Sequence, residues 1–376
     1  MQTSLTLIWI KIILFLAKGF IFSSEMGITM KKSFLYLLSI FLIITLGCYG
    51  VVKIVGTHET QKDNHLLVSS FYPQYIILLN LVDNCDSIAI KNMTSSATGC
   101  LHDYQITSAD MKKLDHADAF IINGGGMENF LDDILKVYPD IKIIDSCKNI
   151  ELLENNYSHS HEHNDNNIDE ESEEHSDKHI NADLDGHEKK HNADVSEEHS
   201  HEHGNYNAHV WLNPQNYIKQ IRNITLELCK IYPNYKKQIN DNSKNYINRI
   251  STLQDKIDIL KSSINSEKKR NAIIFHDSFS YIADSFNLNI IECIEIESDS
   301  SLSAGTIAST IDEIETHDIR ILLTEKQFKT TIADNIASET KAKVYVLDSL
   351  VTGDYTKDSY IKGMESNIKT IQKIFE

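Results

Sequence analysis

At 376 residues the chain is longer than a single hydrophobic core usually supports, so we expect two domains. The formal net charge of −18 is unevenly spread, because residues 151–208 hold 17 Asp and Glu against 3 Lys, which leaves −4 for the rest of the chain. The rest of the sequence has no cluster of basic residues of the kind that binds nucleic acid.

The amino-terminal segment is typical of an exported protein. An apolar run at 34–48 follows the basic stretch Met30–Lys32, as in a signal peptide, so we interpret residues 1–29 as an upstream extension. The end of the run is similar to a bacterial lipoprotein cleavage site, in which Cys48 would be lipidated. Without cleavage the run could remain as a membrane anchor. In either case we expect the protein to be extracytoplasmic, either anchored to the membrane or periplasmic.

Strands and helices alternate in two separate stretches of the chain. In the first stretch we expect strands at 65–70, 87–90, 117–122 and 141–144, and helices at 72–82, from Thr107 onward, and at 127–138. In the second stretch we expect strands at 272–275, 289–294, 319–323 and 343–347, and helices at 278–286, 306–316, 332–340 and 358–375. Such alternation predicts two α/β lobes, each a mostly parallel sheet flanked by helices.

Between these stretches, apolar residues repeat at helical spacing from 235 to 263. A helix of this length would run about 40 Å at about 1.5 Å per residue. We expect it to join the lobes, with a coiled-coil partner as the alternative. The expected segments are an extension with a signal or anchor (1–49), a linker (50–65), an N-terminal lobe (66–150), a His-rich acidic loop (151–208), a linking helical region (209–265) and a C-terminal lobe (266–376).

The acidic loop is also rich in histidine, with ten of the chain's 17 histidines between 159 and 203. It has almost no large apolar side chains, so it cannot offset its ordering entropy, and we expect it to be disordered. Imidazole suits zinc, copper and nickel, and the carboxylates attract divalent cations. This favours a metal collector over a plain solvated linker. The candidate auxiliary ligands are His159, His161, His163, His175, His179, His187, His191, His199, His201 and His203.

Four other side chains are candidates for an ordered metal site. His276 and Asp348 each directly follow a predicted strand of the C-terminal lobe, and open parallel sheets bind ligands beyond the carboxyl ends of their strands. His102 lies in a loop of the N-terminal lobe, and His209 lies where the acidic loop ends. Three imidazoles and one carboxylate form a closed set that suits Zn2+. The six cysteines are widely spaced, so we assign no disulfide and do not expect cysteine to be a ligand.

Six short motifs support this interpretation: Ser70–Pro73, Leu101–Tyr104, Ala117–Phe120, Ala208–Pro214, Phe275–Tyr281 and Leu347–Leu350. In this order, over residues 66–375, they resemble landmarks of the metal-binding solute-binding proteins of ABC uptake systems, in particular the zinc-uptake branch. The resemblance implies two α/β lobes bridged by a rigid helix, with the metal held between them by His102, His209, His276 and a carboxylate. It also implies a permease with a separate ATPase as partners, and no enzymatic activity.

Departures from the family pattern bear on the ligands. Leu101 precedes the first ligand where some zinc-binding members have an acidic side chain, which favours Asp348 as the carboxylate. Ser349 replaces the proline that is common after that aspartate. The manganese branch has a carboxylate at the position of His276, and an imidazole there moves the preference towards zinc, with manganese as the alternative metal.

The pattern favours a receptor that captures zinc and delivers it to a permease for import. One alternative is a zinc hydrolase with Asp277 or Glu325 as the general base, but catalytic zinc keeps an open position and the chain has no HExxH motif. The other alternative is a surface adhesin or metal buffer in which the His-rich loop is the functional part. Deleting 155–205 would discriminate, since a transport receptor should keep its function with reduced efficiency.

Overall fold

The computed structural model describes residues 65–94, 99–101, 104–154, 206–264, 270–294, 302–327 and 329–376. The predictions for Cys48 and its signal segment, for His102 and for the ten histidines of the acidic loop lie outside these residues. Within them, no helix combines the length and the apolar character needed to cross a membrane.

The N-terminal lobe contains a four-stranded parallel sheet in the order β2-β1-β3-β4. Its elements are β1 (His65–Ser69), α3 (Tyr72–Leu81), β2 (Ile88–Asn92), α4 (Ser108–Met111), β3 (Ala119–Ile122), α5 (Leu131–Val137) and β4 (Ile143–Asp145). Helix α4 begins as predicted, because the side chains of Thr107 and Asp110 each accept a hydrogen bond from the other's backbone N–H. Helix α5 begins at Leu131 and not at the expected residue 127. The Glu128 carboxylate accepts hydrogen bonds from the N–H groups of Asn123 and Gly124 and so holds the residues before the helix in a turn.

The C-terminal lobe contains a second four-stranded parallel sheet, in the order β10-β9-β7-β8. Its elements are β7 (Asn271–Ile274), α8 (Ser280–Ser285), β8 (Asn289–Cys293), α9 (Ala304–Thr316), β9 (Ile321–Glu325), α10 (Thr331–Glu339), β10 (Lys343–Leu347) and α11 (Ser359–Phe375). The expected strand at 319–323 is displaced by two residues. The Ile319 N–H bonds to the Ile314 carbonyl at the end of α9, and pairing with β7 begins only at Ile321. Glu325 is therefore the last residue of the strand.

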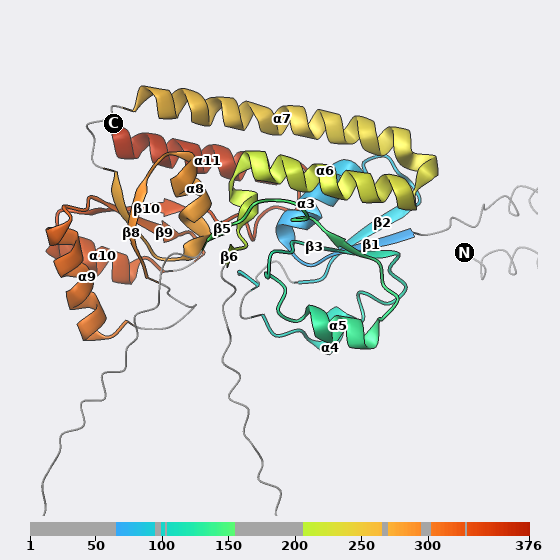
Figure 1. Ribbon diagram of the computed structural model, residues 1–376, viewed down its shortest axis with the longest axis horizontal. Coiled ribbons are helices and arrows are strands. Elements are labelled where there is room, and N and C mark those ends of the chain that lie inside the picture. Colours follow the sequence, from blue (N-terminus) through green and yellow to red (C-terminus); the bar gives the residue numbers. More distant parts are fainter. Residues whose placement is uncertain are drawn as a thin grey trace, which may run out of the picture. The chain divides into compact units, whose positions relative to one another are not determined.

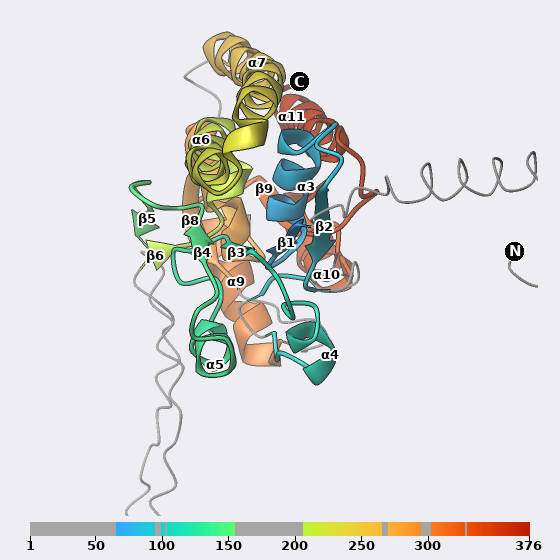
Figure 2. The same ribbon diagram turned by 90° about the vertical axis from the view of Figure 1, so that its right-hand side faces the viewer.

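Two long helices, α6 (Pro214–Ile231) and α7 (Lys236–Ser263), connect the lobes. Figures 1 and 2 show them on the same side of the sheets as α3 and α11, with α4, α5, α9 and α10 on the opposite side. Helix α7 packs against α3 of the N-terminal lobe and α11 of the C-terminal lobe, so its apolar stripe is buried within this chain. The predicted fold of two parallel α/β lobes joined by a long helix is confirmed.

The apolar core runs continuously from the N-terminal sheet, past α6 and α7, to one face of the C-terminal sheet. Strand β7 divides its side chains between two cores, because successive residues of a strand point to opposite faces. Ala272 and Ile274 belong to the continuous core, whereas Ile273 belongs to a smaller one together with residues of α9 and α10. The continuous core makes the lobes and the linking helices one packed unit.

The two ends of the acidic loop are ordered and lie side by side. Strands β5 (Leu153–Glu154) and β6 (Tyr206–Asn207) pair antiparallel, with Glu154 opposite Tyr206. The Tyr281 hydroxyl accepts a hydrogen bond from the Leu153 N–H and donates one to the Asn207 carbonyl. The segment that we expected to be disordered from 151 to 208 therefore begins and ends in a small ladder fixed to the C-terminal lobe.

Candidate metal centre

Among the described residues, Cys100, His209 and His276 form the group that could hold a metal ion. One ligand atom from each lies within 4.8 Å of the others. The Cys100 Sγ atom is 3.0 Å from Nε2 of His209, and the centroids of the two imidazole rings are 5.1 Å apart. Side chains from both lobes thus meet at one point.

The chain segments that carry the histidines explain this convergence. His276 directly follows β7, so its side chain lies at the carboxyl edge of the C-terminal sheet, as predicted. His209 lies between β6 and the short 3-10 helix η2 (Val210–Leu212), and its side chain is fully buried against Trp211. The positions of the two residues along the chain therefore bring both rings to the same place.

Asn207 orients the ring of His209. Its Oδ1 atom lies 3.0 Å from Nδ1 of His209 and also accepts a hydrogen bond from the His209 backbone N–H. Its Nδ2 atom donates to the Asp277 carbonyl, which fixes the orientation of the amide. Because an amide oxygen only accepts, Nδ1 of His209 carries the proton, and the lone pair of the neutral ring is on Nε2, the atom that faces Cys100.

Glu325 orients the ring of His276 in the same way. Its Oε2 atom is 2.7 Å from Nδ1 of His276, and the hydroxyl of Ser349 donates to the other carboxylate oxygen. Burial disfavours the charged imidazolium, but hydrogen bonds to Cys100 and Glu325 and their negative charge outweigh it, so the pKa of His276 is raised well above its ordinary value. Ser349, noted as a departure from the family pattern, here supports the carboxylate that holds a histidine.

Asp277 adds negative charge beside both rings. Its Oδ1 atom is 3.3 Å from Nδ1 of His209 and 3.6 Å from Nε2 of His276. The same oxygen is buried and has no hydrogen-bond partner among the described residues. A buried carboxylate in this position favours a cation between the two imidazoles.

The structure separates Asp348 from this group. Its carboxylate accepts hydrogen bonds from Gln327 and from the Leu350 N–H, and it lies 3.1 Å from the Lys326 ammonium. Of the four predicted ligands, the structure therefore brings His209 and His276 together, gives Asp348 other partners, and does not describe His102. A ligand role for Asp348 stays a prediction.

Our expectation that cysteine takes no part in a metal site conflicts with the position of Cys100. We based it on the absence of paired-cysteine spacing, which is the signal of an all-thiolate site. The signal that could have identified Cys100 is its place two residues before His102, in the loop expected to carry a ligand. The roles of Asn207 and Ser349 had no such signal, because side chains that orient a ligand follow no fixed spacing.

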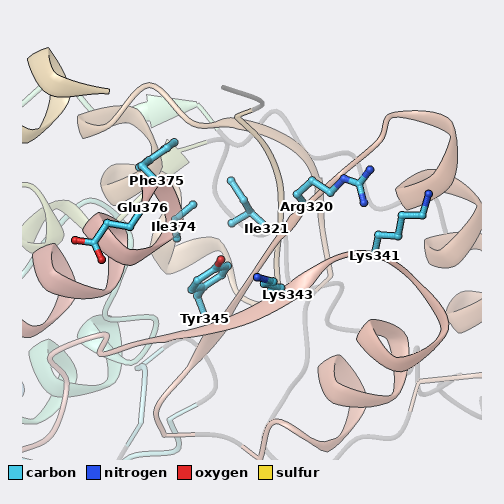
Figure 3. Close-up of a pocket in the computed structure, with 8 residues that line it drawn as sticks. All are labelled: Arg320, Ile321, Lys341, Lys343, Tyr345, Ile374, Phe375 and Glu376. Carbon is cyan, nitrogen blue, oxygen red and sulfur yellow. The ribbon is translucent and has the colours of Figure 1, made fainter. Parts of the chain in front are cut away.

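A pocket of about 400 Å³ lies elsewhere in the C-terminal lobe, lined by residues that include Arg320, Lys341, Lys343 and Phe375 (Figure 3). Ile321 and Lys343 begin β9 and β10, so the pocket lies at the amino ends of these strands. The cluster around His276 lies at their carboxyl ends. The pocket is therefore not part of the metal centre.

Comparison with known proteins identifies relatives over most of the chain. Residues 67–374 match the family described as zinc-uptake complex component A, periplasmic. The chain is 26% identical over 349 residues to the zinc-binding protein AdcA of Streptococcus pyogenes serotype M3, which covers 91% of this chain and 61% of that protein. It is 26% identical over 322 residues to the high-affinity zinc uptake system protein ZnuA of Bacillus subtilis, which covers 85% of this chain and 89% of that protein.

The fold is also similar to solved structures. Zn(II)-bound AdcA from Streptococcus pneumoniae aligns with a TM-score of 0.62 at 20% sequence identity, covering 83% of this chain and 58% of that one. The chain spans 61% of the length of the AdcA protein of S. pyogenes. The structural likeness supports the two-lobed fold that the sequence predicts.

Proposed function

Because the chain belongs to the family of periplasmic zinc-uptake component A proteins, we propose that it captures zinc outside the cytoplasm and delivers it to the permease of an ABC importer. The observation that supports this most directly is the pair formed by His209 and His276. The Nδ1 atom of each ring is held by an oxygen, so the orientation of both rings is set before the metal arrives, and His276 loses a proton when it binds. Preorganised ligands of this kind favour tight binding.

The proposed ligands are His209 and His276, joined by His102 as the sequence predicts. Asp348, the carboxylate expected from the sequence, is held by Lys326 and Gln327, and its ligand role stays a prediction. Imidazole donors favour zinc over manganese, which prefers oxygen. A separate ATPase would drive import through the permease. Lipidation of Cys48 or retention of the apolar segment at 34–48 would hold the receptor near that permease, and the histidines of the acidic loop would bind further zinc weakly.

Zinc uptake by intact cells tests this proposal. Cells that lack the protein should take up radioactive zinc slowly when zinc is scarce, and the parent chain should restore the initial rate. The double variant His209→Ala/His276→Ala should not restore it. His317→Ala is the matched control, because His317 follows the end of α9, is half exposed and pairs with Glu313 of that helix.

Excess zinc should allow all strains to grow, which separates a defect in uptake from a general defect. Equal uptake by the parent and the double variant, with both proteins present in equal amounts, would refute the proposed role of this centre. Normal uptake by cells that lack the protein would refute the transport function itself.

A further inference from the structure

We propose that Cys100 binds the metal through its thiolate, which makes this centre selective for soft cations such as Zn2+ and Cd2+ over hard ones. This inference rests on the proposed function, because it concerns the same centre. It adds a sulfur ligand that neither the sequence motifs nor the names of the relatives indicate. The argument depends on where Cys100 lies, on what surrounds it and on what a thiolate contributes.

The position of Cys100 is that of a ligand. Its sulfur is 3.0 Å from Nε2 of His209, the atom that carries the lone pair when Asn207 binds Nδ1. It also belongs to the group in which the ligand atoms of His209 and His276 all lie within 4.8 Å. A zinc ion bound at about 2.3 Å from sulfur and about 2.0–2.1 Å from nitrogen would fit ligand atoms this close.

The surroundings of Cys100 favour a soft cation. The Met127 thioether sulfur lies 3.7 Å from the thiol, and Met127 and Leu101 are fully buried. Cys100 itself is half buried, whereas His209 is fully enclosed. The sulfur therefore contacts a polarizable thioether and lies beside two imidazoles, surroundings that suit thiophilic metals and not manganese.

Binding through sulfur is balanced by the loss of one proton. Cys100 and His276 share this proton through their hydrogen bond. It passes to solvent, and the lone pairs of the sulfur and of the neutral His276 ring then form the bonds to the metal. One thiolate and two neutral imidazoles leave a divalent ion with a single positive charge. The buried Asp277 oxygen beside both rings compensates for part of that charge.

The competing interpretation is that Cys100 only hydrogen-bonds to the histidines. A serine hydroxyl at this position would make the same hydrogen bonds, so Cys100→Ser would then leave metal binding almost unchanged. A thiolate ligand is different, because a neutral hydroxyl is a poor ligand for zinc. Cys100→Ser therefore distinguishes the two roles with little change in size.

Cobalt provides a direct readout, because a thiolate bound to Co2+ gives a near-ultraviolet charge-transfer absorption that imidazole and carboxylate ligands do not. The full-length reduced protein with one equivalent of Co2+ should show this absorption, and Cys100→Ser should lose it. The sequence of the acidic loop contains no cysteine, so cobalt bound there cannot contribute. Cys229→Ser is the matched control, since Cys229 is a half-buried thiol that contacts Asn240 and Lys236 on the linking helices.

Competition between metals gives a second readout. Loss of a ligand should cost at least the roughly 10–100-fold in affinity that is typical of a side chain that only orients a ligand. We expect zinc affinity to fall by that factor or more in Cys100→Ser, and cadmium affinity to fall further than zinc affinity. Thermal unfolding of the metal-free variants shows whether the substitution has damaged the fold.

The outcomes separate this inference from the function on which it rests. A parent protein that binds zinc tightly but shows no charge-transfer absorption with cobalt would overturn the role of Cys100 and leave the transport function intact. The same holds if Cys100→Ser retains the parent's cadmium-to-zinc affinity ratio. A folded parent protein that binds no zinc tightly would overturn both.

Discussion

Glu325 and Asp348 differ in what they can do for a bound metal. Glu325 holds Nδ1 of His276, whereas Asp348 binds Lys326, Gln327 and its own following turn. We therefore expect Glu325→Ala to weaken zinc binding by about 10–100-fold, as is typical when a side chain that orients a ligand is lost. Asp348→Ala should have a smaller effect. Titration of both variants with zinc measures the difference.

Glu325→Gln serves as the control for cavity formation, because it keeps the size of the side chain and can still accept a hydrogen bond from His276. Its zinc affinity should lie between that of the parent and that of Glu325→Ala. A larger loss in Asp348→Ala than in Glu325→Ala would support the ligand role that the sequence predicts for Asp348. It would mean that Asp348 leaves Lys326 when the metal binds.

Glu128 should make the stability of the fold depend on pH. Burial raises the pKa of Glu128 to about 7 from the ordinary value of 4.5, although hydrogen bonds from the Asn123 and Gly124 N–H groups oppose the shift. Between these values the folded chain binds a proton that the unfolded chain releases, so this contribution is present below about pH 4.5 and is lost as pH rises through about 7.

The variant Glu128→Gln should lack that contribution. Denaturant unfolding of parent and variant at about pH 5 and about pH 8 should show the parent losing up to about 3 kcal/mol more than the variant over this range. The difference between the two proteins is the relevant quantity, because other groups titrate in both. Parallel pH profiles would mean that Glu128 is ionised in the folded protein at both values.

At the residue scale, the sequence predicts ligands better than it predicts the residues that support them. His276 could be identified because a polar residue that directly follows a buried strand has a defined place in a parallel sheet. Glu325 was expected to lie just beyond its strand and instead ends it. Asn207 contacts His209, which lies two residues further along the chain, whereas Glu325 at the end of β9 contacts His276 after the neighbouring strand β7. A contact between two strands depends on their register, which a single sequence does not specify.

At the scale of elements, helix α7 offers a test of the linking region. Ile250 is fully buried on its apolar stripe, whereas Ile259 on the same helix is 70% exposed. We expect Ile250→Ala to lower the free energy of unfolding by about 2–5 kcal/mol, because it leaves a cavity in the continuous core. Ile259→Ala, the same change at an exposed site, should stay within about 0.5 kcal/mol of the parent.

Denaturant unfolding of the two variants measures these values. Similar small losses would contradict the packing of α7 against both lobes, as they would mean that the stripe contributes little to stability. A change at Ile250 that broadens the transition or splits it in two would indicate that the lobes unfold separately. A single shifted transition is expected, because one core includes residues of both lobes and of α7.

The periodic elements were the most predictable part of the fold. The stripe from 235 to 263 predicts α7 to within one residue at its start, because the buried positions of a long helix repeat many times. Strand β9 was displaced because Ile319 is apolar and buried although it belongs to the turn after α9. Burial alone does not separate the last residues of such a turn from the first residues of a strand.

At the scale of the whole molecule, the acidic loop is joined to the metal centre by one short path. Asn207 ends β6 at the root of the loop, and its side chain holds His209. The Tyr281 hydroxyl hydrogen-bonds to Leu153 on β5 and to Asn207 on β6. Tyr281 belongs to α8, which closely follows His276 and Asp277 in the chain. The ladder formed by β5 and β6 therefore helps to keep His209 in place.

Removal of the loop should accordingly leave the metal centre intact. Glu154 and Tyr206 lie opposite each other in an antiparallel pair, so an Asn-Gly turn in place of residues 155–205 can join them without strain. We expect this variant to fold, to keep one tight zinc site and to lose the weaker sites of the ten histidines, because the remaining ligands are held by β6, β7 and the loop at Cys100. Isothermal titration gives both the stoichiometry and the affinity.

A second variant that also carries Asn207→Ala should bind zinc about 10–100-fold more weakly, as expected when His209 loses its orienting partner. If tight binding disappears with the loop while Asn207 and the ladder remain, the zinc is held by the loop, and the cluster of His209, His276 and Cys100 has another role.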